Sequence, residues 1–218
     1  MRDTAIVFAR APRLGAVKRR LARGVGARAA LRFYTATLAR LLRRLAADRR
    51  FRTVLAVTPG RAAIRLPVGV GRDVVRIGQG GGDLGQRMGR ALARFPRGRA
   101  AIIGGDIPAA GPDDLRAAFR ALGRAEAAFG PAEDGGYWLV ALGPRRPARP
   151  FAGVRWSGPH ALDDTLRNFP GRRVARLRRL RDVDEAADLR PAQAGPNAVA
   201  RGRRPAVGSP AAGARDRG

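Results

Sequence analysis

The sequence predicts a three-layer α/β fold with a largely parallel sheet. Short apolar runs, such as residues 4–9 and 100–103, have the length and composition of buried strands. Between such runs lie segments of helical periodicity, most plainly residues 27–47, where large apolar side chains recur every three or four positions. Alternation of this kind is typical of βαβ units, whose parallel strands are covered by helices on both faces.

The elements follow from the same two signals along the chain. We expect strands at residues 4–9, 53–57, 74–77, 100–103, 126–130, 137–142 and 173–177. We expect helices at residues 27–47, 83–95 and 159–168, with a short helical turn after Asp182–Glu185. Another helix begins at Pro112, since proline suits a first helical turn and the two acids that follow suit its positive end. Residues 61–73 are predicted to be a loop.

Length and composition favour one globular domain and a tail. We assign residues 1–190 to the domain. Residues 191–218 consist mostly of Ala, Gly, Pro and Arg, lack the apolar content of a core, and are predicted to be disordered. With no cysteine in the chain, disulfides, thiolate metal sites and a cysteine nucleophile are excluded. Because His160 is the only histidine, a metal site would have to use carboxylates, which prefer Mg²⁺ or Mn²⁺.

The net charge of +27 comes from arginines that are spread over the whole chain. A charge of this size suggests nucleic acid, but no known nucleic-acid-binding motif or aromatic-interleaved basic stripe accompanies it. We therefore expect no specific nucleic-acid partner. No apolar run approaches the length of a signal sequence or a membrane span, so a cytoplasmic protein without membrane contact is expected.

Lys18 is the only lysine among 44 basic residues. It follows the first predicted strand, in a loop that contains Gly15. An ammonium ion is a compact charge with three donors, whereas a guanidinium is a planar fork, so the two are not interchangeable in a tight site. A lysine after a strand and a glycine-containing loop suggests a phosphate contact. The alternative is an ordinary surface lysine.

Two further polar clusters follow predicted strands. In Gln79–Asp83, the glycines Gly80 and Gly81 permit a close approach to a flat or charged ligand. Asp106 comes directly after the apolar run 100–103, at the edge where parallel sheets bind ligands, and suits Mg²⁺. Its alternative role is that of a turn or helix-capping residue.

Three candidates near the carboxyl end have competing structural explanations. Asp182 and Asp184 lie two residues apart, which on an extended segment places them on one side, where they complete an oxygen-rich metal site with Asp106. Asp184 is equally suited to cap the final helical turn. The segment Glu133–Gly136 is as typical of a turn between strands as of a site. His160, at a helix start, is best explained as a cap or surface residue.

In combination, these segments resemble a known family. The motifs are Phe8–Pro12 with Gly15–Lys18, Gln79–Gly85, Gly104–Pro108, Gly130–Tyr137 and Leu180–Asp184. Over residues 4–190 they are similar to the bacterial GT-A-fold glycosyltransferase-like family associated with radical-SAM and selenium gene clusters and with arsenosugar biosynthesis. That family is related to the molybdenum-cofactor and 2-phospholactate nucleotidyltransferases. The chain departs from the usual pattern at three positions, Arg19, Ala110 and Gly158.

The resemblance implies a Rossmann-like GT-A fold and a nucleotide-binding transferase that requires a divalent metal. It places Lys18 and Asp106 in catalysis, and Asp182 or Asp184 beside Asp106 at the metal. It also implies substrate contacts from the glycine-rich segments of the cleft and from the turn that faces the acceptor, namely Gly15, Gln79, Gly80, Gly81, Asp83, Asp134, Gly135 and Gly136.

Two reactions fit this platform. The first is glycosyl transfer from a nucleotide sugar to a small acceptor, which is the family's usual assignment. The second is nucleotidyl transfer with release of pyrophosphate, favoured by the lysine loop and by a Gly-x-Asp in place of an Asp-x-Asp segment. A non-catalytic nucleic-acid-binding protein is the third hypothesis, and charge alone suggests it.

Overall fold

The computed structural model describes residues 2–60 and 74–189, so the predicted loop 61–73 and the predicted tail 191–218 lie outside the described residues. Seven strands form one sheet in the order β3-β2-β1-β4-β6-β5-β7. Their bounds are β1 Asp3–Arg10, β2 Phe51–Thr58, β3 Val75–Gly78, β4 Ala100–Gly104, β5 Ala127–Pro131, β6 Tyr137–Leu142 and β7 Val174–Arg176. Every strand predicted from the sequence is present.

The sheet is mostly parallel, as predicted. The pairs β1–β2, β1–β4, β2–β3 and β5–β7 are parallel, whereas β6 runs antiparallel to both β4 and β5. β1 has β2 on one side and β4 on the other, so the loops that leave β1 and β4 diverge at the carboxyl edge of the sheet. An open α/β sheet binds ligands at such a point.

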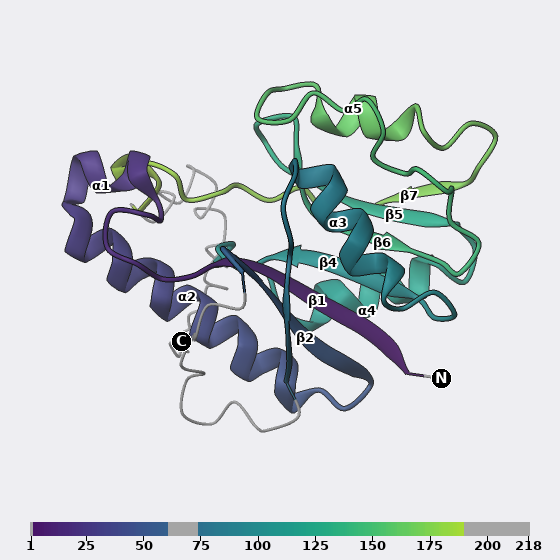
Figure 1. Ribbon diagram of the computed structural model, residues 1–218, viewed down its shortest axis with the longest axis horizontal. Helices are drawn as coiled ribbons and strands as arrows, with labels where there is room; N and C mark the ends of the chain where they lie inside the picture. The colour runs from purple at the N-terminus through teal and green to yellow at the C-terminus, as the bar shows by residue number, and fades with distance from the viewer. Residues whose placement is uncertain (1, 61–73, 190–218) are drawn as a thin grey trace, which may run out of the picture.

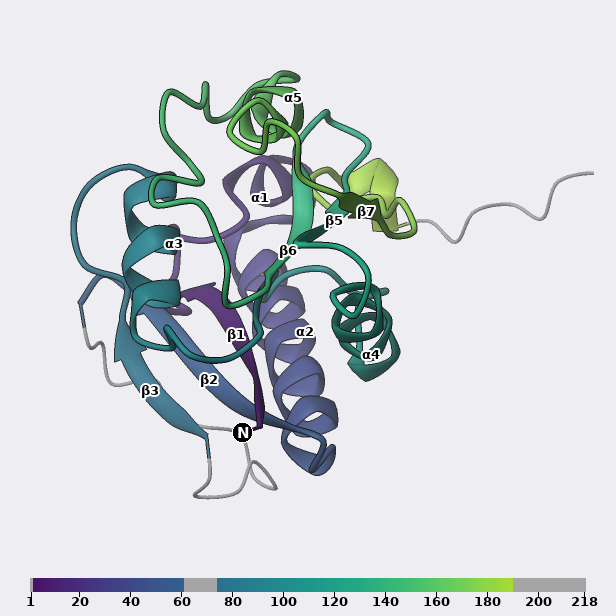
Figure 2. The same ribbon diagram turned by 90° about the vertical axis from the view of Figure 1, so that its right-hand side faces the viewer.

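Helices cover both faces of the sheet, which gives three layers (Figures 1 and 2). α2 Ala27–Ala47 and α4 Pro112–Ala121 pack on one face, and α3 Leu84–Ala93 and α5 Ala161–Leu166 pack on the other. Alternate residues of the strands enter two separate core clusters: Val7 and Leu55 face α2, whereas Ile6 and Val54 face α3. None of the described helices combines the length and the apolar character that a membrane span requires.

The predicted α2 matches the observed helix, because its buried stripe includes Tyr34, Leu38 and Leu42 at four-residue spacing. The short helix α1 Arg19–Val25 was not predicted. It has seven residues, buries only Leu21, and begins without a side-chain cap, so it carries little periodic signal. The final turn is a 3-10 helix, Ala186–Leu189.

Candidate active site

A cleft of about 750 Å³ opens at the carboxyl edge of the sheet, outside β1 and β4. Its walls come from the loop after β1, the loop after β4, the start of α3 and the segment around Trp156. Lys18, Gln79, Asp83, Asp106 and Asp184 all line it. Residues predicted separately along the sequence are thus brought together in one place.

Lys18 lines this cleft, and its side chain is only 4% exposed. Its Nζ donates to Asp106 Oδ2 at 2.7 Å and to Asp184 Oδ1 at 3.0 Å. Burial alone would lower the pKa of Lys18, but the two carboxylates outweigh it and raise that pKa above its ordinary value. Lys18 is therefore a buried side chain that keeps its positive charge in this site, rather than the surface lysine of the alternative interpretation.

The backbone holds Lys18 in this position. It adopts the left-handed conformation, φ 46° and ψ 50°, at the residue before α1. Such a conformation is unfavourable for a residue other than glycine and is found where the surroundings enforce it. The start of the loop is fixed by the buried Tyr34, whose hydroxyl accepts from Arg10 N and donates to Arg10 O. Gly15, at φ 74°, provides the turn that leads to Lys18.

Asp106 is placed by the two glycines that precede it. A Cβ on Gly105 would lie 2.9 Å from Leu38 Cδ1 and 3.1 Å from Phe8 O, so only glycine fits where the chain crosses the end of β1. The amide of Gly105 donates to Phe8 O at 2.9 Å, which ties this crossing to the first strand. Asp106 is thereby aimed at Lys18 and is 36% exposed to the cleft.

Asp182 and Asp184 reach the site because the chain returns beside β5. Leu180 pairs with Ala132 and donates to Pro131 O at 3.1 Å, at the carboxyl edge of the sheet. Asp188 then accepts from the amides of Asp184 and Glu185, so this acid caps the final turn. The carboxylate of Asp184 is left to bind Lys18 instead of serving as the cap.

Asp182 is the unusual acid of this group. Its Oδ1 is buried and has no hydrogen-bond partner, and it lines a small apolar pocket together with Asp106. Burial, and then the negative charge of Asp106, raise the pKa of Asp182 to about 7. An unpaired buried carboxylate oxygen costs free energy unless a cation or a donor reaches it.

The donors present fit a hard divalent cation. Among the described residues, no three His, Cys, Asp or Glu side chains are arranged as a complete metal site. Mg²⁺ does not need one, since it commonly takes one or two carboxylates and completes its shell with water and substrate phosphate oxygens. Asp106 and the unpaired oxygen of Asp182 supply that minimum.

The segment Gln79–Asp83 has a more structural role than predicted. The side chain of Gln79 is buried, and its Nε2 donates to Ala9 O at 3.2 Å and to Ala56 O at 2.9 Å, which joins the ends of β1 and β2. Asp83 Oδ1 accepts from Gln86 N and caps α3. Gly80, at φ 79°, and Gly81, whose carbonyl accepts from Arg90, shape the turn before that helix.

The turn Glu133–Gly136 connects the antiparallel strands β5 and β6, which form a hairpin. Ala132 N donates to Gly136 O, Asp134 Oδ1 accepts from Gly136 N, and Gly135 has φ 83°. These residues do not line the cleft, although the charge of Asp134 acts on Asp182. His160 is the exposed N-cap residue of α5, as expected.

Sequence reasoning missed several residues of the cleft, notably Arg10, Arg87, Trp156 and Ser157. Trp156 packs edge-on to Tyr137, with ring centroids 6.4 Å apart, and a Cβ on Gly85 would lie 2.8 Å from its ring. Ser157 has φ 65°. Among the described non-glycine residues, only Lys18 and Ser157 have positive φ, and both line this cleft. In the sequence, the glycine at position 85 was the available sign that a large side chain, here Trp156, packs against the start of α3.

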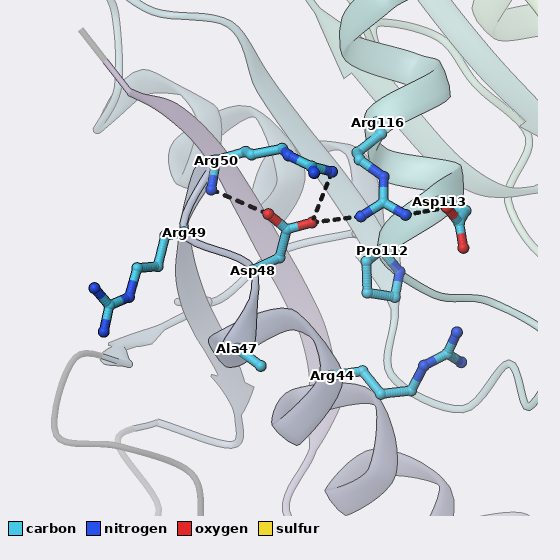
Figure 3. Close-up of a pocket in the computed structure, with 8 residues that line it drawn as sticks. All are labelled: Arg44, Ala47, Asp48, Arg49, Arg50, Pro112, Asp113 and Arg116. Atoms are coloured by element: carbon cyan, nitrogen blue, oxygen red, sulfur yellow. Dashed lines mark hydrogen bonds and ion pairs between the residues drawn. The ribbon is translucent and has the colours of Figure 1, made fainter.

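A second hollow, of about 630 Å³, lies between the end of α2 and the start of α4 (Figure 3). This hollow is also lined by several arginines, but aspartates lie beside them. Asp48 accepts from Arg50 N at 3.0 Å and from Arg116 Nη1 at 2.8 Å, and Arg116 also pairs with Asp113. Two of its four arginines, Arg50 and Arg116, are therefore paired with acids of the same hollow.

Comparison with known proteins agrees with this fold. A protein from Desulfovibrio desulfuricans G20, named a "putative nucleotide-diphospho-sugar transferase", is 29% identical and has a TM-score of 0.79, over 87% of this chain and 85% of that one. The 4-diphosphocytidyl-2C-methyl-D-erythritol synthase of Anaerococcus prevotii DSM 20548 has 9% identity and a TM-score of 0.58, over 86% and 92%. A cytidylyltransferase from Leptospira borgpetersenii has 15% identity and a TM-score of 0.53, over 84% and 78%. The last two show the fold alone.

No curated protein matches the sequence. Residues 41–158, more than half of the chain, match the model of a family described as an uncharacterized protein conserved in bacteria (DUF2064). The chain therefore belongs to the DUF2064 family and has the fold of the nucleotide-diphospho-sugar transferases.

Proposed function

We propose that this protein is a metal-dependent transferase that acts on a nucleotide-linked substrate, with a nucleotide sugar as the first candidate donor. One observation carries the proposal: a buried lysine and three carboxylates meet at the carboxyl edge of a nucleotide-diphospho-sugar transferase fold. The similar Desulfovibrio protein bears a nucleotide-diphospho-sugar transferase name, which supports a donor of this class.

The roles of the residues follow from their chemistry. Lys18 offers an ammonium with three donors, which suits the oxygens of a diphosphate. Asp106 and Asp182 would hold Mg²⁺ or Mn²⁺, which neutralises phosphate charge and stabilises the leaving group when bound. Asp184 keeps Lys18 in place through the 3.0 Å contact. The segment Gly80–Asp83 remains the proposed nucleoside contact. Asp134–Gly136 do not line the cleft themselves, but the charge of Asp134 acts on Asp182, and this turn remains the proposed acceptor side.

In the described state, Lys18 contacts Asp106 and Asp184 and offsets part of their negative charge. When a nucleotide–metal complex enters, the ammonium is free to turn from Asp106 to a phosphate oxygen, because a lysine side chain has four rotatable bonds and no planar constraint. The total charge of the cleft then stays nearly constant. This exchange explains why a lysine, and not one more arginine, stands at this position.

Nucleotidyl transfer with release of pyrophosphate is the second candidate. The arginines Arg10 and Arg87, which line the cleft beside the Lys18 loop, favour it because a nucleoside triphosphate carries more charge than a nucleotide sugar. The acceptor is a small molecule, and the arsenosugar pathway implied by the family resemblance supplies one candidate. Since these substrates are cytoplasmic metabolites, we place the enzyme in the cytoplasm.

A thermal-shift and calorimetric screen tests the proposal. Nucleoside mono-, di- and triphosphates and nucleotide sugars are compared with and without Mg²⁺ and Mn²⁺, since a ligand that binds only the native state raises the melting temperature. We expect metal-dependent stabilisation by at least one nucleotide class, and its loss in Asp106→Asn. If no nucleotide binds in the presence of either metal, the proposed function is wrong.

A further inference from the structure

A small hollow of about 340 Å³ adjoins the cleft on the side of β2. Three arginines from a strand, a loop and a helix line it: Arg10 at the end of β1, Arg13 in the following loop, and Arg87 on α3. Arg10, Ala16, Thr58 and Arg87 line both the hollow and the cleft that contains Lys18. A single ligand can therefore extend from Lys18 into the hollow.

The charges of this hollow are not balanced. No carboxylate lines it, and neither Arg10 nor Arg13 forms an ion pair with a side chain of the described residues. Arg87 donates only to neutral oxygens, Gln79 Oε1 at 3.3 Å and Asp83 O at 3.2 Å. Burial, and then the positive charge of Arg10, lower the pKa of Arg87, while Asp83 partly opposes them. The hollow of Figure 3 differs because Asp48 and Asp113 accompany its arginines.

The hydrogen-bonding groups around the hollow are mostly donors. Thr58 O already accepts from Ala11 N at 2.8 Å, and Asp83 O accepts from Arg87. Of the other lining carbonyls, Arg10 O accepts from the Tyr34 hydroxyl and Arg13 O accepts from Ala16 N at 3.1 Å, while Gln79 Oε1 accepts from Arg87. With these acceptors used, a ligand group in the hollow has to supply acceptors and negative charge. Gln79, buried and held on both strands, positions Arg87 for that contact.

We propose that this hollow binds a third anionic group of the substrate, beyond the two phosphates served by Lys18 and the metal site. Guanidinium groups bind phosphate and carboxylate in a bidentate manner, and three of them around one space suit such a group. This inference rests on the proposed function and narrows its substrate class. The third anion has two sources: the terminal phosphate of a nucleoside triphosphate, or the carboxylate of a nucleotide-linked sugar acid.

Inorganic polyphosphates test the site without knowledge of the base. Affinities for pyrophosphate and tripolyphosphate are measured by calorimetry, with Mg²⁺ and at physiological salt, for wild type, Arg10→Gln, Arg87→Gln and Arg49→Gln. Arg49 is the matched control, since it is exposed, lies in the hollow of Figure 3 and changes the net charge equally. We expect tripolyphosphate to bind wild type about tenfold more tightly than pyrophosphate, as one added charge-assisted contact suggests.

That preference should disappear in Arg10→Gln and Arg87→Gln and persist in Arg49→Gln. An equal loss in all three variants would show diffuse attraction to a basic protein and overturn the site, as would an absence of preference in wild type. Lys18→Met is titrated alongside them, and pyrophosphate binding that is present in wild type and lost in Lys18→Met would leave the proposed function intact. UTP, UDP-glucose and UDP-glucuronate then separate the two sources, and equal binding of all three would again refute a third anion site.

Discussion

Replacement of Lys18 by methionine tests the central contact of the cleft. The two side chains have similar length, so the change removes the ammonium and its 2.7 and 3.0 Å contacts while keeping the packing. Each hydrogen bond to a charged group contributes about 1.5–3 kcal/mol when well shielded. Asp106 and Asp184 are 36% and 45% exposed, so water screens both contacts. We therefore expect a total loss of about 2 kcal/mol in the free energy of unfolding.

The assay is urea unfolding at pH 8 with a chelator present. Lys18→Met leaves Asp106 and Asp184 without the ammonium that they contact in wild type, so the variant should unfold at a lower urea concentration. Lys18→Arg separates the effect of charge from that of shape. It keeps the positive charge, so it should recover the stability lost in Lys18→Met, whereas its nucleotide affinity should stay about tenfold below that of wild type. Equal stability of wild type and Lys18→Met at pH 8 would refute the view that the carboxylates hold this ammonium.

Three further outcomes are expected. Asp106→Asn should fold and lose Mg²⁺-dependent nucleotide binding, as calorimetry with and without metal will show; unchanged metal dependence would make Asp106 a turn residue. The folded state raises the pKa of Asp182 from 3.8 to about 7, so folded Asp182 binds its proton more tightly than Asp182 of the unfolded chain. The free energy of unfolding of the metal-free protein should therefore fall by up to about 4 kcal/mol as the pH rises from 4 to 7. In urea titrations across this range, Asp182→Asn should abolish that fall. Gly130→Ala should lower the melting temperature, since the added Cβ would lie 2.5 Å from the ring of Trp138; an unchanged value would show that the ring moves freely.

The fold was largely predictable because its signals are local. The strands around Ile6 and Ile102 are continuous apolar runs, and α2 has a regular buried stripe. The sequence left open whether β5 and β6 form a hairpin, since the turn at Asp134 suits several connections. Helix α1 was missed for lack of periodicity.

The site was predictable only in part. Lys18 and Asp106 could be proposed because each follows an apolar strand, but the contact of Lys18 with Asp184 joins residues 166 positions apart. That contact depends on a left-handed backbone conformation at Lys18, which no pattern of residues in the sequence predicts. The arginine hollow was missed for a different reason: in a chain with 43 arginines, the side chains of Arg10 and Arg87 carry no signal until the fold places them together.

Because Lys18 is the sole lysine of the chain, a reagent for lysine amines reports selectively on this cleft. Reductive methylation with ¹³C-formaldehyde would label one side chain besides the α-amino group, and the NMR resonance of the methylated Lys18 would report on the cleft. In the ligand-free protein, the contacts with Asp106 and Asp184 protect that amine and slow its modification. The rate of labelling would thus report how often the Lys18 ammonium leaves Asp106 and Asp184. A ligand that draws the ammonium away from them would shift the resonance of the labelled Lys18.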